Sequence, residues 1–100
     1  SDMNEESVPE NRPRFRQVGI RARCDMYGHV VPSRIDFEDE RGNPLKFRIT
    51  RVVREELAES RKSPIPEAGG IRYTVIFAGK THILYRVGDK NWFLSLTETC

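Results

Sequence analysis

The sequence predicts one mostly β domain of six short antiparallel strands. Apolar and polar residues alternate over six segments of the chain, which is typical of a strand with one buried face. Stretches rich in Gly, Asp, Asn and Pro separate these segments and indicate turns. With 100 residues, the chain is long enough to bury a single core without a metal or a disulfide.

Three regions follow one another along the chain. Residues 1–13 are polar, contain Pro9 and Pro13 and lack periodicity, so we predict a disordered N-terminal arm. Residues 14–97 form the single β domain, and residues 98–100 are expected to be a flexible C-terminus. There is no signal peptide and no apolar run of membrane-spanning length, so we expect a cytoplasmic protein.

Three strands are predicted in the first half of the domain. The first has inward positions at Val18, Ile20, Ala22 and Cys24. Phe15 is out of phase with them, which predicts a bulge near Gly19. The second covers 31–37, where Pro32 cannot donate to a ladder and indicates an edge or a bulge. The third points Leu45, Phe47 and Ile49 inward and continues through Val52 and Val53 with a change of phase.

The second half begins with a loop over residues 54–70, in which we predict a short helical turn. Three strands follow. The fourth strand is expected to face inward at Ile71, Tyr73, Val75 and Phe77, and the fifth at Ile83, Tyr85 and Val87. The sixth runs from Trp92 to Leu96. Loops of three to five residues between them fit hairpins.

Two meanders of three strands each have one apolar face that must be covered. A small six-stranded barrel of SH3-like type covers both faces and removes exposed edges. A two-layer β sandwich is the alternative.

The last third of the domain contains Ala68-Gly69-Gly70-Ile71-Arg72-Tyr73-Thr74, then Gly79-Lys80, Leu84-Tyr85 and Trp92-Phe93. The second strand contains Val31-Pro32-Ser33-Arg34-Ile35. Over residues 18–96 these stretches make the chain resemble a family of small, uncharacterised bacterial β-rich proteins. The resemblance implies a bacterial, cytoplasmic, single-domain protein. It implies no functional residue.

The sequence does not predict an enzyme, and we expect no catalytic residue, cofactor or metal. Cys24, Asp25 and His29 are the only local cluster, whereas a metal site needs three or four convergent ligands. We expect Cys24 to be a buried reduced thiol, and it can pair with Cys100 only if the fold brings the two together. The acidic residues Asp36, Glu38, Asp39 and Glu40 fit a solvated hairpin tip.

Basic residues on outward strand positions suggest a nucleic-acid-binding face. If the second strand lies between the first and the third, five bases share one outer surface. They are Arg21, Arg23, Arg34, Lys46 and Arg48. Small β barrels bind single strands with a basic groove and aromatic stacking platforms, for which Tyr27, Tyr85 and Trp92 are candidates. The net charge of +2 is low for a dedicated nucleic-acid module.

A second apolar face suggests a protein-contact surface. Ile76, Leu84 and Phe93 are expected on the face opposite the core, where they could meet the 54–70 loop, a second copy of the chain or a partner. The sequence therefore favours a non-enzymatic protein-interaction or structural module that can self-associate. The alternative is a module that binds single-stranded nucleic acid through its basic sheet face.

Overall fold

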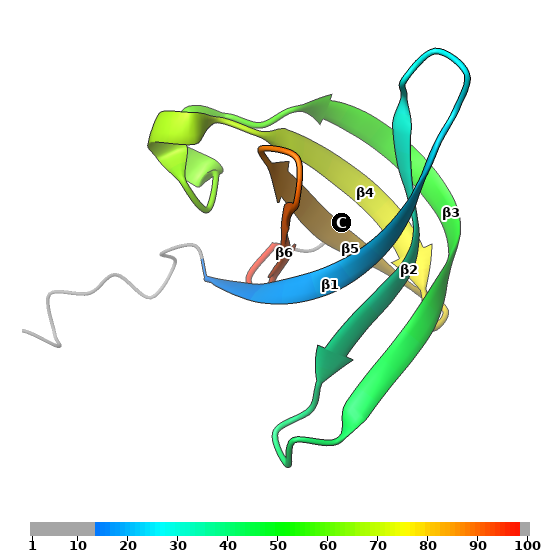
Figure 1. Ribbon diagram of the computed structural model, residues 1–100. Coiled ribbons are helices and arrows are strands. Elements are labelled where there is room, and N and C mark those ends of the chain that lie inside the picture. Colours follow the sequence, from blue (N-terminus) through cyan, green and yellow to red (C-terminus); the bar gives the residue numbers. More distant parts are fainter. Residues whose placement is uncertain (1–13, 99–100) are drawn as a thin grey trace, which may run out of the picture.

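The computed structural model describes residues 14–98, so the predicted N-terminal arm and Cys100 lie outside the described residues. It contains six strands and two short 3-10 helices (Figure 1). The elements are β1 (Phe15–Cys24), β2 (Val30–Glu38), β3 (Pro44–Leu57), η2 (Ser60–Lys62), η3 (Pro66–Ala68), β4 (Ile71–Phe77), β5 (Lys80–Val87) and β6 (Asn91–Ser95).

The strands form one closed antiparallel barrel in the order β1-β2-β3-β4-β5-β6, and β1 pairs with β6 to complete it. β3 pairs with both β2 and β4, so the two predicted meanders belong to a single sheet. Closure gives each strand two neighbours, and unpaired strand edges remain where the long strands β1 and β3 run past the barrel. The predicted barrel is confirmed and the sandwich alternative is wrong. The finer SH3-like assignment stays a prediction.

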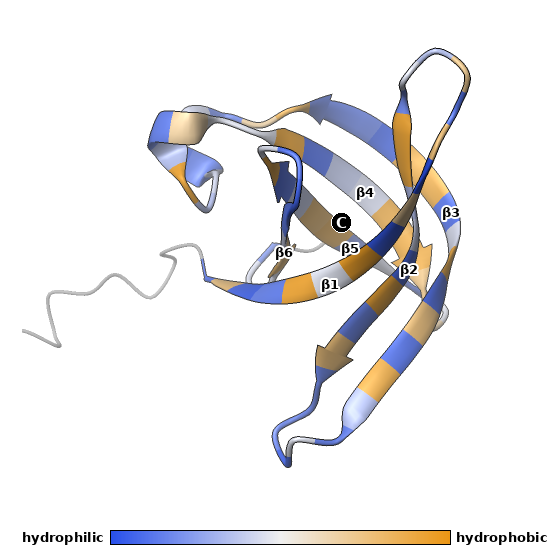
Figure 2. Cartoon of the chain, viewed as in Figure 1, coloured by the Kyte–Doolittle hydropathy of each residue, from blue (hydrophilic) through white to orange (hydrophobic). Residues whose placement is uncertain are grey.

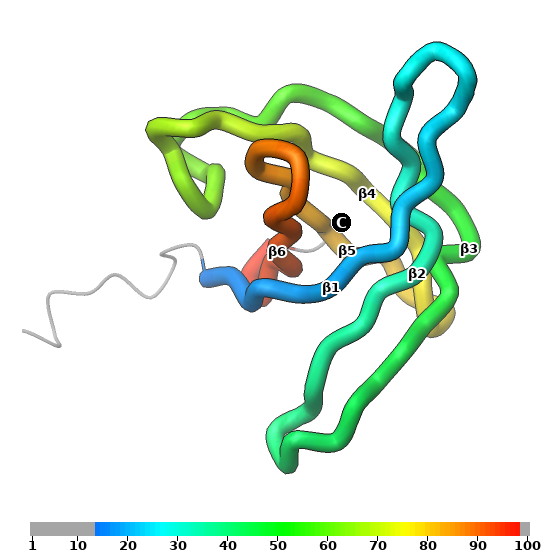
Figure 3. Tube along the Cα trace, in the orientation of Figure 1, coloured from blue at the N-terminus to red at the C-terminus, as the bar shows by residue number. Residues whose placement is uncertain are grey.

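Two long strands, β1 and β3, each divide their length between two neighbours. β1 pairs with β6 over Phe15–Val18 and with β2 over Gly19–Cys24. The β1–β2 and β2–β3 hairpins therefore extend beyond the barrel at opposite ends (Figures 1 and 3). Cys24 lies in the projecting part of β1 and is exposed, which corrects its prediction as a buried thiol.

β3 bends because its pairing with β4 shifts register twice, between Ile49 and Arg51 and between Val52 and Arg54. These shifts confirm the predicted change of phase near Val52. The strand then runs on to Leu57, so the loop predicted over residues 54–70 begins later than expected, and η2 and η3 confirm the short helical turn predicted within it. Residues 54–57 are good helix formers, but pairing with the start of β4 overrides that weak local preference.

Figure 2 shows apolar and polar residues alternating along the strands. All six strands contribute side chains to the buried core of the barrel. Tyr73 and Trp92 lie in contact, with ring centroids 5.3 Å apart. The buried cluster comprises Val18, Ile35, Ile49, Tyr73, Val75, Phe77, Leu84, Trp92 and Leu94. The inward positions predicted for β4 are confirmed in this cluster by Tyr73, Val75 and Phe77.

The phase predicted for β5 is wrong. Leu84 lies opposite both Tyr73 and Leu94 and belongs to the core cluster. Ile83 and Tyr85 therefore point to the outside of the barrel, yet each is as fully buried as Leu84. Alternation cannot resolve the phase of a strand that is apolar and covered on both faces.

The outer face of β5 is covered in part by Phe15 and by the segment that follows β6. Phe15 packs edge-on against Tyr85, with ring centroids 5.3 Å apart. The Tyr85 hydroxyl donates to Glu98, and Arg72 forms ion pairs with Glu98 at 3.1 Å and with Glu56 at 2.6 Å. Burial, together with the contact to Glu98, raises the pKa of Tyr85. Glu98, in the segment predicted as a flexible end, is thus fixed to the sheet.

The burial of Leu84 in the core can be tested by comparison with an exposed leucine. Leu84 has no exposed surface, whereas the Leu57 side chain is 84% exposed. Leu84→Ala should lower the free energy of unfolding by about 2–5 kcal/mol because it leaves a cavity in the core. Leu57→Ala should change it by less than about 0.5 kcal/mol. Urea denaturation measures both, and equal losses would contradict the assignment.

Candidate nucleic-acid interface

Three of the five predicted basic residues form a row across the outer face of β1, β2 and β3. Arg21 lies directly opposite Arg34, and Arg34 lies directly opposite Arg48. All three residues are exposed. Neighbouring strands are about 4.8 Å apart, so the row spans roughly 10 Å between its outer members. The structure thus brings together residues that are far apart in the sequence.

The next row along the same face is Gly19, Asp36 and Lys46. Lys46 is exposed and extends the basic surface. Asp36 lies between the two basic strands, but among the described residues it forms no ion pair within 4.0 Å, and its buried Oδ1 has no hydrogen-bond partner. It therefore does not neutralise the arginine row by direct contact.

Arg23 lies beyond a bulge and is separated from the row. The register shifts between Arg21 and Ala22, so that Ala22 faces Pro32 and Arg23 faces Val31. Ser33 is the extra residue, and its hydroxyl donates to the Arg21 carbonyl at 2.9 Å. The bulge predicted at Pro32 is confirmed. The one predicted near Gly19 is wrong, because the register shows no shift there and Phe15 simply lies on the outer face against Tyr85. Arg23 remains exposed on the projecting hairpin.

The arginine row is electrostatically unfavourable for the isolated protein. Like charges directly opposite each other on neighbouring strands destabilise a sheet. Within residues 14–98, Arg21, Arg34 and Arg48 have no ion-pair partner that would offset this repulsion. A bound polyanion would remove this repulsion.

The tip of the β1–β2 hairpin is held rigidly by Asp25. Its Oδ1 accepts hydrogen bonds from the backbone N–H groups of Tyr27 and His29, each at 2.9 Å. The same hydrogen bonds lower the pKa of Asp25. Met26 and Tyr27 at the tip are each 86% exposed.

His29 connects this hairpin to β3. Its Nε2 lies 2.7 Å from Glu55 Oε1, and its Nδ1 lies 3.5 Å from Asp25 Oδ2. The hydrogen bond to Glu55 and the charge of that carboxylate raise the pKa of His29. The sequence does not reveal this contact, because Glu55 falls in the predicted 54–70 loop, to which no strand register could be assigned.

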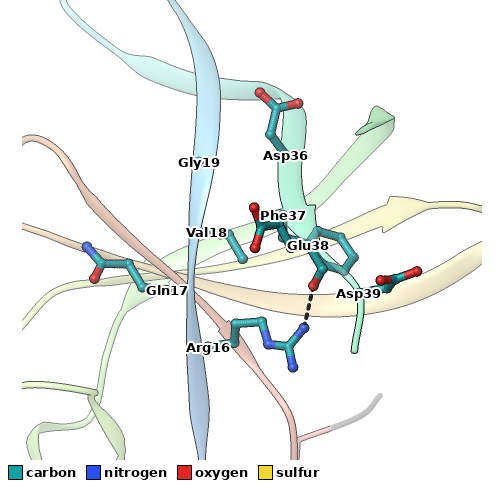
Figure 4. Close-up of a pocket in the computed structure, with 8 residues that line it drawn as sticks. All are labelled: Arg16, Gln17, Val18, Gly19, Asp36, Phe37, Glu38 and Asp39. Atoms are coloured by element: carbon teal, nitrogen blue, oxygen red, sulfur yellow. Dashed lines mark hydrogen bonds between the residues drawn. The ribbon is translucent and has the colours of Figure 1, made fainter. Parts of the chain in front are cut away.

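A cavity of about 440 Å³ lies at the other end of the barrel, between β1 and the end of β2 (Figure 4). Arg16 projects into it and donates to the Glu38 carbonyl at 2.8 Å. Asp39, one of the predicted acidic residues, instead closes its own turn by accepting from the backbone N–H groups of Arg41 and Asn43. Arg16 and Asp39 are therefore occupied by structural contacts, whereas Asp36, which also lines the cavity, has an Oδ1 without a hydrogen-bond partner.

The predicted protein-contact face does not form as a unit. Leu84 is in the core, whereas Ile76 and Phe93 lie on the outside and are only half-buried. Among residues 14–98, no group of three or more His, Cys, Asp or Glu side chains is arranged to hold a metal ion. Over the same range no helix has the length and apolar character needed to cross a bilayer.

The pKa values of the two histidines should be shifted in opposite directions. Contact with Glu55 raises the pKa of His29, whereas burial beside Phe77 lowers the pKa of His82. While Glu55 is ionised, the stabilisation from the His29–Glu55 pair should be fully present below the unfolded pKa of histidine, about 6.5. It should be lost as the pH rises through the raised pKa of His29. NMR titration of the imidazoles measures both values. Glu55→Gln should shift His29 alone toward about 6.5, and an unchanged His29 would contradict the contact.

Comparisons with protein-family models, with curated proteins and with solved structures find no significant match for this chain. The resemblance inferred from the sequence therefore stays a prediction, and the functional argument depends on the geometry described above.

Proposed function

We propose that this protein is a nucleic-acid-binding module that holds a phosphate backbone on the outer face of β1, β2 and β3. The observation that carries the proposal is the row of Arg21, Arg34 and Arg48, which are opposite one another and exposed. Such a row repels itself in the free protein and becomes favourable when anionic oxygens lie between the guanidinium groups.

Arginine is suited to this task because its planar guanidinium can donate two parallel hydrogen bonds to one phosphate. Lys46, in the adjacent row, supplies a further cation on the same face. Contacts to phosphates fix the position of a strand but do not read its sequence. We therefore propose binding of modest affinity and strong salt dependence, without base specificity from this row.

The protein-interaction role that the sequence favours has less support. Its motivating observation was a shared apolar surface of Ile76, Leu84 and Phe93. Leu84 is packed in the core, so the remaining two residues are separated on the outer face. The basic row, in contrast, is continuous across three strands.

Binding should weaken with salt in proportion to the number of phosphates contacted. Three to five contacts to a single strand predict a slope of about −2 to −3.5 in log K against log salt concentration. Arg34→Gln should weaken binding and reduce the slope by about 0.7. Arg61→Gln removes the same charge from exposed η2, away from the row, and should change neither (Figure 1). Fluorescence anisotropy with a labelled oligonucleotide measures these slopes, and absence of binding at low salt would refute the proposal.

The same substitution should stabilise the free protein. Arg34 has an arginine opposite it on each side, so Arg34→Gln should raise the free energy of unfolding by about 0.2–1 kcal/mol at low salt. The gain should shrink at high salt because exposed charges are screened. Urea denaturation at two salt concentrations measures it. A destabilised variant would show that Arg34 makes a favourable native contact instead.

A further inference from the structure

The two projecting hairpins have the same turn with different residues at the tip. In each, an Asp accepts backbone hydrogen bonds through Oδ1 at 2.8–2.9 Å, and a Gly with φ near +80° follows. The Gly N–H donates to the Asp carbonyl at 3.0 Å in both. The sequences are Asp25-Met26-Tyr27-Gly28-His29 and Asp39-Glu40-Arg41-Gly42-Asn43.

This repetition shows that the turn itself does not require apolar residues at its tip. The β2–β3 turn has Glu40 and Arg41 at these positions, which are the charged residues expected in water. The β1–β2 turn instead exposes 86% of Met26 and 86% of Tyr27. The turn itself therefore does not account for this adjacent pair of exposed apolar side chains, and contact with a ligand is the reason that we infer.

We propose that Tyr27 is a stacking platform for an unpaired base, so that the ligand of the basic face is a single-stranded nucleic acid. The inference rests on the proposed function, since the arginine row supplies the phosphate contacts. It adds that the nucleic acid is single-stranded and that Tyr27 selects for it.

The position of Tyr27 relative to the basic residues supports the inference. Arg21 and Arg23 lie on the same strand, and that strand leads directly to the tip. Tyr27 follows Arg21 by six positions, which is at most about 20 Å of extended chain. That distance is within reach of a strand of a few nucleotides, comparable to the sites of other small β barrels.

Rigidity makes the tip a better platform than a mobile loop. Asp25 fixes the turn from within, and the 2.7 Å contact between His29 and Glu55 ties it to β3. A platform that is ordered before binding loses less conformational entropy when a base stacks on it. Stacking requires a free base face, which duplex nucleic acid does not offer at internal positions.

The test compares a labelled single-stranded oligothymidylate with a blunt duplex of equal length, by anisotropy at low salt. Tyr27→Ala should weaken single-strand binding roughly 5- to 150-fold, the range for loss of one stacked base. It should leave duplex binding and the salt slope unchanged, because no phosphate contact is lost. Tyr27→Phe should retain wild-type affinity, because it keeps the aromatic face.

A second variant uses small polar residues at the tip, because the β2–β3 turn shows that the turn itself needs no apolar side chain there. Met26→Ser with Tyr27→Ser leaves the net charge unchanged and introduces no side chain that can stack on a base or bind a phosphate as a cation. It should lose single-strand affinity to the same extent as Tyr27→Ala while retaining the wild-type unfolding midpoint. A loss in Tyr27→Ala that this variant does not reproduce would overturn the stacking role.

Different results would contradict the phosphate-binding face and the stacking role of Tyr27. Salt-dependent binding of single strand and duplex with equal affinity, unaffected by Tyr27→Ala, would overturn the platform and leave the phosphate face intact. No binding of either by the wild-type protein would overturn both. If the wild-type protein instead sediments with phosphatidylserine vesicles through Tyr27 and ignores the oligonucleotide, the hairpin tip is a membrane contact and the proposal is wrong.

Discussion

The register of β1, β2 and β3 is the constraint on which the rest of the structure depends. Ile20 lies opposite Ile35, and Ile35 lies opposite Phe47, so these three side chains meet on the inner face of the sheet. Successive residues of a strand point to opposite faces, so the same register aligns Arg21, Arg34 and Arg48 outside. A slip of one residue would expose Ile35, which is completely buried. The core therefore enforces the arginine row despite its repulsion.

Barrel closure leaves the two hairpins and the basic row as the surface features that could contact a ligand. The interior is filled with side chains, and Leu84 at its centre touches residues of β4 and β6. The long strands instead extend past the barrel as two hairpins with the same turn and different tips. One tip carries Glu40 and Arg41, and the other carries Met26 and Tyr27. The molecule thus has a charged end and an aromatic end, with the basic row on the strands between them.

The sequence could predict those strands that have one solvent-exposed face and one buried face. Alternation placed Arg34 outside and Ile35 inside because each lies in a clearly polar or apolar position. It failed for β5, where Ile83, Leu84 and Tyr85 are successive and all buried, so a period of two carries no information. It failed again at Glu55, whose strand is imposed by pairing with Tyr73 on β4. The contact of Glu55 with His29 depends on that pairing, and no local pattern could have revealed it.

The direct measurement of the central claim is an NMR titration that follows the Nε–Hε groups of the arginines as a short single-stranded oligonucleotide is added. The account predicts that the signals of Arg21, Arg34 and Arg48 shift together with one dissociation constant, while the signal of Arg61 in η2 stays in place. Shifts confined to other arginines, or equal shifts at Arg61 and Arg34, would contradict a binding face on β1, β2 and β3.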